Sequence, residues 1–139
     1  MRLTRGSDYG LRGMVYMARQ PVGQVCLVSQ VAAAEDLPES YLAKIFQDLA
    51  RNRLLMSHRG AKGGFSLVSE PEEVNLLQII EAVEGPIALA PCLDVREGCE
   101  RIEICEIYEA LDSAQAQMTL VLKNTTLADL VARQNGSGD

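Results

Sequence analysis

The sequence predicts a mainly α-helical fold with one small β hairpin. Apolar residues recur at three- and four-residue intervals through much of the chain, which is typical of helices that lie on a core. Two short apolar runs flank a glycine-rich turn at residues 59–64, which indicates the hairpin. Near the C-terminus the apolar positions follow a heptad rhythm, which indicates a long helix suited to dimerisation.

Length, composition and charge limit the classes of protein that this sequence can encode. At 139 residues and 47% hydrophobic content, the chain is long enough for one compact domain with an extension. No apolar run approaches the roughly 20 residues that span a bilayer, and the N-terminus lacks the apolar stretch of a signal peptide, so we expect a cytoplasmic protein with no membrane partner. Residues 1–69 carry nine bases and five acids, whereas residues 70–139 carry four bases and fourteen acids. The N-terminal half can therefore present a basic face to phosphates, unless both halves simply have solvated faces.

The first helix is expected to begin after Ser7, a favoured N-cap residue, and to end before Pro21. The connector that follows contains Cys26 between apolar neighbours, and we expect this thiol to be packed in the core. The predicted core stripe of the helix has the spacing i, i+3, i+4, i+7 and consists of Leu11, Met14, Val15 and Ala18.

Two short helices separated by Leu37-Pro38 form the outline of a helix-turn-helix. Ser29 is expected to cap the first of them, which runs to about Asp36. Pro38 suits the first turn of the second. The second helix carries one apolar face at helical spacing, made of Leu42, Ile45, Phe46 and Leu49.

The predicted hairpin joins residues 53–58 to residues 64–68 through a turn that carries Arg59 and Lys62. A hairpin directly after a helix-turn-helix, with cations at its tip, is typical of a wing. In a winged helix-turn-helix the second helix enters the major groove of DNA, and the wing reaches phosphates or the minor groove. We therefore predict such a DNA-binding domain over residues 1–85, with double-stranded DNA as its partner. The alternative is an ordinary surface hairpin.

Three of the four cysteines, Cys92, Cys99 and Cys105, lie in the segment 86–106 among many charged residues. Because those charges keep the segment from being buried as a whole, burial does not explain its clustered thiols. The main explanations are a metal or iron–sulfur centre and a thiol switch. Zinc would also suit three thiolates with one oxygen or nitrogen ligand. We interpret this segment as a sensor loop.

Residues 107–134 are expected to form a dimerisation helix and a short terminal helix, and residues 135–139 a disordered tail. Thr126 and Asp129 occupy capping-box positions before the terminal helix. The seam of the long helix can pair with a second copy of the chain or pack on its own domain. This seam consists of Ile107, Leu111, Ala114, Met118 and Val121.

The sequence does not favour an enzyme, and no catalytic residues are assigned. The chain has no Cys-x-x-Cys motif, and its glycine-rich turn lacks the Gly-Lys-Ser/Thr of a P-loop. Its only histidine, His58, lies at the wing without an evident acid–base partner. We expect a structural or phosphate-side role for His58, and no small-molecule substrate.

Several motifs spread over the chain belong to one known pattern: Met1 to Thr4, Ser40 to Leu42, Arg59-Gly60, Gly63 to Phe65, Ile80 to Pro86, the three cysteines and Thr125 to Leu130. With these motifs the sequence resembles, over nearly its whole length, the IscR/NsrR family of bacterial winged-helix regulators, also called Rrf-type. The resemblance implies a homodimeric, DNA-binding repressor. Its operator binding would be controlled by an iron–sulfur cluster that senses iron–sulfur status, nitric oxide or redox state. The alternative is a repressor without iron that is stabilised by zinc or switched by its thiols.

The resemblance also implies the ligands of the cluster. Cys92, Cys99 and Cys105 would supply three of them. In IscR-type proteins a histidine completes a 2Fe–2S site, but Tyr108 stands at that position here. In NsrR-type proteins an aspartate of the partner subunit completes a 4Fe–4S site, and Asp8 matches it. We therefore favour 4Fe–4S over 2Fe–2S, although Asp8 could instead only cap the first helix.

For DNA, the resemblance implies contacts from the second helix of the motif, from the wing and from nearby cations. Side chains at the start and on the polar side of that helix would meet bases and phosphates, and the wing would enter or flank the minor groove. The predicted set is Arg2, Ser29, Ser40, Tyr41, Lys44, Arg51, Arg59 and Lys62.

Overall fold

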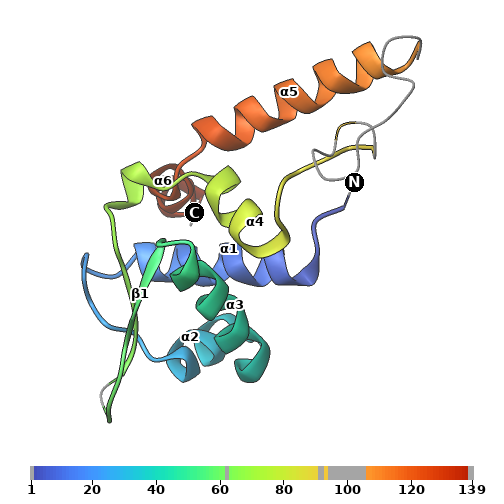
Figure 1. The fold of residues 1–139 in the computed structure, drawn as a ribbon. Coiled ribbons are helices and arrows are strands. Elements are labelled where there is room, and N and C mark those ends of the chain that lie inside the picture. Colours follow the sequence, from blue (N-terminus) through green and yellow to red (C-terminus); the bar gives the residue numbers. More distant parts are fainter. Residues whose placement is uncertain (1, 62, 91–92, 94–105, 138–139) are drawn as a thin grey trace.

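The structure is a computed structural model that describes residues 2–61, 63–90, 93 and 106–137. It is mainly helical with one two-stranded antiparallel hairpin, which confirms the predicted fold class. In Figure 1, helices α2 and α3 and the hairpin lie on one side of α1, whereas α4, α5 and α6 lie on the other. The elements are α1 Arg5–Ala18, α2 Val28–Glu35, α3 Glu39–Arg51, β1 Leu55–His58, β2 Gly64–Leu67, the 3-10 helix η1 Pro71–Glu73, α4 Leu76–Glu84, α5 Tyr108–Asn124 and α6 Leu127–Ser137.

Helix α1 turns a face rich in glycine to the core. Its N-cap is Thr4, whose hydroxyl accepts a hydrogen bond from the backbone N–H of Ser7, so the helix begins earlier than predicted. Of the predicted core stripe only Met14 is fully buried, and the other three members are half-buried. All four nevertheless lie on the core, because the three half-buried side chains pack against its buried residues. The prediction missed the glycines on the same face, since glycine carries no hydrophobic signal. The buried positions of α1 are Gly6, Ser7, Gly10, Gly13, Met14 and Met17.

The missing side chains let α3 and α4 lie close to the backbone of α1. A Cβ atom at Gly13 would stand 2.6 Å from Cε1 of Phe46 in α3. At Gly10 it would stand 3.2 Å from Cγ2 of Ile45 and 3.4 Å from Cγ2 of Val83, in α3 and α4 respectively. Three helices thus meet at a distance that larger residues on α1 would not allow.

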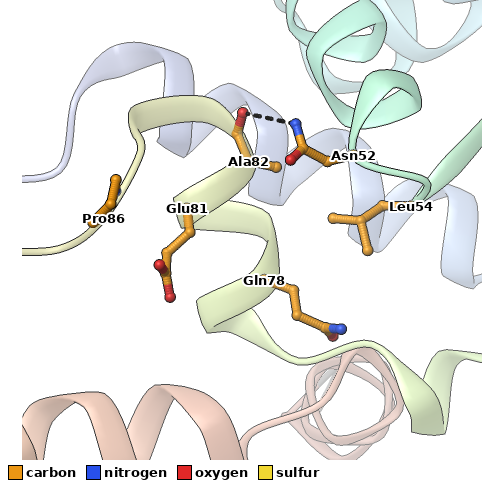
Figure 2. A pocket seen from close by; sticks show the side chains of 6 residues that line it. All are labelled: Asn52, Leu54, Gln78, Glu81, Ala82 and Pro86. Atoms are coloured by element: carbon orange, nitrogen blue, oxygen red, sulfur yellow. Dashed lines mark hydrogen bonds between the residues drawn. The ribbon is translucent and has the colours of Figure 1, made fainter.

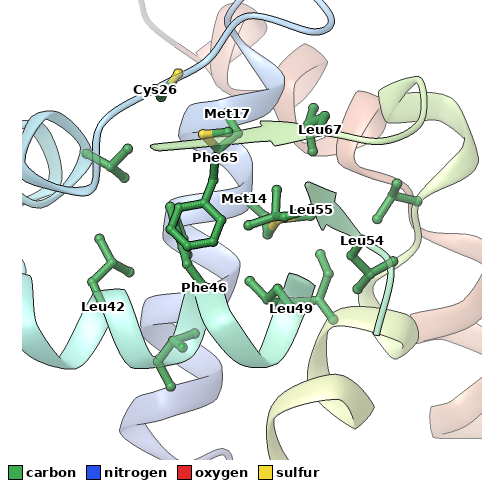
Figure 3. Close-up of a cluster of buried hydrophobic side chains, with 14 of the residues drawn as sticks. Met14, Met17, Cys26, Leu42, Phe46, Leu49, Leu54, Leu55, Phe65 and Leu67 are labelled. Atoms are coloured by element: carbon green, nitrogen blue, oxygen red, sulfur yellow. The ribbon is translucent and has the colours of Figure 1, made fainter. Parts of the chain in front are cut away.

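The helix-turn-helix forms as predicted, with shifted caps. Helix α2 begins at Val28, so Ser29 is its second residue and not its cap. It ends at Asp36, which has a left-handed φ of 55°. All four predicted apolar residues of α3 are buried, at 4% exposure or less, which confirms its core face. Figure 3 shows three of them, Leu42, Phe46 and Leu49, among the other core side chains.

Strand β1 of the hairpin packs on α3, and β2 packs on α1. Strands β1 and β2 pair with Leu55 opposite Leu67 and His58 opposite Gly64. The backbone of Cys26 forms an isolated antiparallel bridge with that of Phe65 in β2, through two hydrogen bonds. Burial raises the pKa of the Cys26 thiol, which is 2% exposed, and a weak hydrogen bond to the Gln24 carbonyl opposes part of that rise. The prediction that Cys26 is a core residue is confirmed (Figure 3).

The last two segments of the chain attach to α4 and α1. Asn75 caps α4 and forms a capping box with Gln78. The predicted box of Thr126 and Asp129 also forms. Leu127, the first residue of α6, is fully buried in the core. Helix α6 packs on α1 and η1, and it runs to Ser137, past residue 134 where the sequence predicted its end.

Helix α5 packs on α4 along one side only. None of its residues is fully buried. The predicted seam is split, because Leu111 and Met118 are half-buried against the chain's own body, whereas Ile107 and Val121 are 63% and 64% exposed. No helix in the described part of the chain is long and apolar enough to cross a membrane.

We predict that Gly13→Ala lowers the free energy of unfolding by about 1–3 kcal/mol, because the new methyl group overlaps the ring of Phe46. Gly10→Ala is the matched control. Its looser contacts should be offset by the higher helix propensity of alanine, about 1 kcal/mol, so its effect should be small. Urea unfolding of the two variants measures the difference. Equal stability losses would contradict the packing described for α1.

Candidate nucleic-acid interface and sensor site

The outer face of α3 is a polar strip opposite the apolar face. Its residues recur at intervals of four, three and four, so they lie in one row along the helix. All four are exposed. Ser40, Lys44 and Arg51 were predicted, whereas Gln47 was missed although the same spacing includes it. The strip consists of Ser40, Lys44, Gln47 and Arg51.

Two of the predicted DNA-binding side chains have partners within the chain. The ring of Tyr41 packs edge-to-face on that of Tyr9, with 5.5 Å between their centroids, and remains 43% exposed. This contact ties the first turn of α3 to α1. Arg51 pairs with Asp48 one turn earlier, which reduces the net positive charge at the end of the strip.

Ser29 in α2, Arg59 at the hairpin turn and Arg2 near the start of the chain are exposed. Helix α2 and the hairpin lie on the side of α1 where α3 lies (Figure 1). Lys62 lies outside the described residues. His58 has a structural contact, because its Nε2 lies 2.8 Å from the Oγ of Ser66, a buried hydroxyl that needs a partner.

Asp8 lies in the first turn of α1 and is half-exposed. Its Oδ1 accepts a hydrogen bond from Nε of Arg12 at 3.2 Å, one turn further along the helix. The N-cap of α1 is Thr4, and Asp8 lies in the first turn of the helix, where a negative charge is favoured. The predicted ligands Cys92, Cys99 and Cys105 lie outside the described residues. Within the described ranges, no three metal-binding side chains converge.

Glu84, the last residue of α4, binds the first turn of α1. Its Oε1 accepts hydrogen bonds from the backbone N–H of Thr4 and from the hydroxyl of Ser7, both at 2.6 Å. Burial raises the pKa of this carboxyl, but the hydrogen bonds from Ser7 and Thr4 outweigh burial and lower its pKa overall. Sequence reasoning missed this contact, because nothing local in the sequence links positions 77 and 80 residues apart.

A shallow hollow of about 390 Å³ lies where the end of α3 meets α4 (Figure 2). Its polar lining consists of the amides of Asn52 and Gln78 and the carboxylate of Glu81. Asn52 donates a long hydrogen bond, 3.5 Å, to the carbonyl of Ala82. The hollow therefore offers amide groups and one acid, without a nucleophile and base in mutual contact.

We predict that Glu84→Ala lowers the free energy of unfolding at pH 7 by about 1–3 kcal/mol, because two hydrogen bonds to a charged acceptor are lost. Glu84→Gln keeps an acceptor oxygen and should lose less. The pKa of Glu84 is lowered on folding, so its charge stabilises the fold above the unfolded pKa of about 4.3 and ceases to do so as the pH falls through the folded pKa.

Chemical denaturation of the wild type and Glu84→Gln across this acidic range tests the sign of the effect. Their difference in stability should shrink as the pH falls, since both side chains are then neutral. A deficit of Glu84→Gln that stays constant with pH would show that the charge contributes nothing.

Comparisons with known proteins identify the family. A relative from Shouchella clausii, the HTH-type transcriptional regulator NsrR, is 31% identical over 136 residues, which cover 97% of this chain and 91% of that protein. A protein of Mycobacterium tuberculosis, provisionally named an HTH-type transcriptional regulator, is 31% identical over 133 residues, covering 94% of this chain and 81% of its own. The solved structure of CymR, the global cysteine regulator of B. subtilis, is similar with a TM-score of 0.73 and 29% identity, covering 96% and 98% of the two chains.

The family model named Rrf2 and described as an iron-dependent transcriptional regulator matches residues 3–133. This match spans every described element from α1 to the middle of α6. It agrees with the winged helix-turn-helix architecture and confirms the resemblance drawn from the sequence. The chain therefore belongs to the Rrf2 family of transcriptional regulators.

Proposed function

We propose that this protein is a homodimeric transcriptional repressor whose affinity for its operator is controlled by an iron–sulfur cluster. The observation that carries the proposal is the exposed polar strip of α3. Helix α3 lies on the same side of α1 as the hairpin (Figure 1). A helix with one buried apolar face and one exposed polar row, followed by a hairpin with a cation at its turn, fits the way a winged helix meets DNA.

In this proposal the strip of α3 enters the major groove. Gln47 can form a bidentate contact with adenine and Lys44 can reach guanine, while Ser40 and Arg59 bind phosphates or the minor groove. The T-shaped contact between Tyr9 and Tyr41 holds the first turn of α3 in place. Two copies of the chain would present two such helices about 34–36 Å apart, one turn of DNA, to a near-palindromic site.

The proposed dimer uses the exposed edge of α5. Ile107, Ala114 and Val121 stand one heptad apart and are exposed in the single chain, while the neighbouring Leu111 and Met118 are half-covered by its own body. Seven-residue spacing keeps such an edge in register along a second helix. Burying it against the same edge of another copy would remove the most exposed apolar side chains of this helix from water.

The proposed cluster is held by the thiolates of Cys92, Cys99 and Cys105 and by the partner's Asp8. The donor set fits, because thiolates are the usual iron–sulfur ligands and Asp8 presents a half-exposed carboxylate at the surface of α1. A carboxylate is a hard ligand beside soft thiolates, so it is the ligand most easily displaced. When bound, the cluster would supply a centre that reacts with nitric oxide or oxidants.

The position of Asp8 supports coupling to DNA binding. It stands between Ser7, which is bound to Glu84, and Tyr9, which packs on Tyr41 in α3. A change in the bonding of the Asp8 carboxylate would therefore affect the turn of α1 that holds α3, the helix proposed to enter the major groove. A coupling of about 1–3 kcal/mol would change operator affinity from several-fold to over a hundredfold.

A second candidate is a repressor without iron, in which zinc stabilises the three thiols or oxidation switches them. The similarity to CymR, a cysteine regulator by its printed title, favours keeping this candidate. The two candidates share the DNA-binding unit and differ in the centre. A protein purified without oxygen should be brown and absorb near 400 nm in the first case, and colourless in the second.

We predict that Lys44→Ala weakens binding to a DNA fragment from upstream of the protein's own gene by about five- to a hundredfold, since one groove contact is worth about 1–3 kcal/mol. Lys123→Ala is the matched control, because Lys123 is an exposed lysine on α5, away from the strip. Fluorescence anisotropy at one stated salt concentration measures both. Equal losses in the two variants would contradict the proposed interface.

We predict that Asp8→Ala alters the cluster spectrum and speeds cluster loss several-fold, while the dimer persists. Asp112→Ala, which removes an exposed aspartate of α5, should change neither property. Anaerobic native mass spectrometry reports cluster content and dimer mass together. A cluster of unchanged spectrum and lifetime in Asp8→Ala would remove Asp8 from the proposed site.

A further inference from the structure

Helices α4 and α6 begin side by side at a junction, here called the corner, which consists of residues 74–76 and 125–127. Its two central residues, Asn75 and Thr126, form an isolated antiparallel bridge. Each of them also caps the helix that follows it and forms a capping box there. The starts of the two helices are therefore fixed internally and also to each other.

Two backbone hydrogen bonds hold the corner together. The N–H of Leu76 donates to the carbonyl of Thr125 at 3.0 Å, and the N–H of Leu127 donates to the carbonyl of Val74 at 2.9 Å. Val74 is 2% exposed and Leu127 is fully buried, and both belong to the core that contains the apolar face of α3. A shift of the corner would therefore disturb the close packing of that core.

Helix α5 ends directly at the corner. Its last residue is Asn124, and Thr125 is its C-cap. The hydroxyl of Thr125 donates to the carbonyl of Val121, in the last turn of α5, at 2.8 Å. Thr125 therefore binds the end of α5 through its side chain and the first residue of α4 through its carbonyl. At this end, α5 passes into the corner without an intervening linker.

The corner also lies next to the proposed dimer contact, because Val121, at the end of the exposed edge of α5, is 64% exposed. In such a dimer the two α5 helices pair, and each α3 is connected to that pair through the corner and the packing of α5 on α4. A small rotation at this connection moves α3. Across a domain about 30 Å wide, a rotation of about 7° moves the far side by about 3.6 Å, close to the rise of one base pair, about 3.4 Å.

We propose that the corner is a positioning element, which sets the distance between the two α3 helices of the dimer and hence the half-site spacing that the protein accepts. DNA is stiff over the length of one site, so a dimer of fixed geometry binds well only where the spacing matches. The inference rests on the proposed function in one respect, the α5 dimer that binds DNA with two α3 helices. It does not depend on the metal centre or its ligands.

A single glycine inserted between Asn124 and Thr125 tests this proposal. It leaves residues 125–127 able to pair with residues 74–76, but it lets α5 pivot, because glycine adds two soft dihedral angles and no side chain. The matched control is a single glycine inserted after Val22, in the loop between α1 and α2. Val22 is 49% exposed, and the residue after it, Gly23, has open space around it.

Footprinting on the fragment upstream of the protein's own gene first locates the two half-sites. Fluorescence anisotropy at one salt concentration then measures binding to duplexes with one base pair added or removed at the centre of the site. The wild type and the control insertion should lose about tenfold or more in affinity for either altered spacing, since DNA or protein must be deformed. The insertion at the end of α5 should lose about threefold or less, while its affinity for the natural spacing falls several-fold because preorganisation is lost.

Hydrogen exchange gives a readout that involves no DNA. The amides of Leu76 and Leu127 should stay protected in both insertion variants, because the corner itself stays paired. The inference is overturned, and the proposed repressor is left standing, if the insertion at the end of α5 keeps the spacing preference of the wild type, whether or not these amides stay protected. A wild type that binds one half-site as tightly as two would contradict the proposed dimeric binding, and the inference with it.

Discussion

The contact of α1 with α3 and α4 is the constraint on which the rest of the structure depends. Glycines at three positions of α1 remove the side chains that would otherwise separate these helices. The core therefore forms at the backbone of α1, with the ring of Phe46 close to Gly13. This packing turns the apolar face of α3 inward and leaves its polar strip on the surface.

The same helix links the two parts of the proposed mechanism. The first turns of α1 contact α4 through Glu84 and contact α3 through Tyr9, and Asp8 stands between these contacts. In the proposed function, Asp8 would bind the metal centre of the partner subunit. That bond would lie in the turn of α1 that holds α3, the proposed recognition helix.

Much of the fold could be predicted from the sequence, because the signals involved are local. The apolar face of α3, the caps at Asn75 and Thr126 and the buried Cys26 all follow from spacing and residue type, and all are present. The core face of α1 was predicted only in part. Its apolar stripe packs on the core, but its buried glycines leave no hydrophobic pattern. The cap of α1 was placed at Ser7, whose hydroxyl is instead bound to Glu84.

The candidate site was predictable only in part. The DNA-binding set named most of the polar strip, yet it omitted Gln47, which the spacing of its neighbours would have included. Glu84 binds Thr4 and Ser7, 80 and 77 positions away, and no local pattern marks such contacts. The roles of the three cysteines and of Asp8 as metal ligands stay predictions, supported by residue chemistry and by membership of the Rrf2 family.

In the proposed mechanism, the state of the thiol-bound centre controls the affinity of the protein for DNA. The most direct test compares the affinity of one anaerobic preparation for a fragment upstream of its own gene before and after the cluster is removed, at one fixed ionic strength. The account predicts a difference between several-fold and over a hundredfold. Equal affinities of the cluster-loaded and cluster-free protein would contradict it.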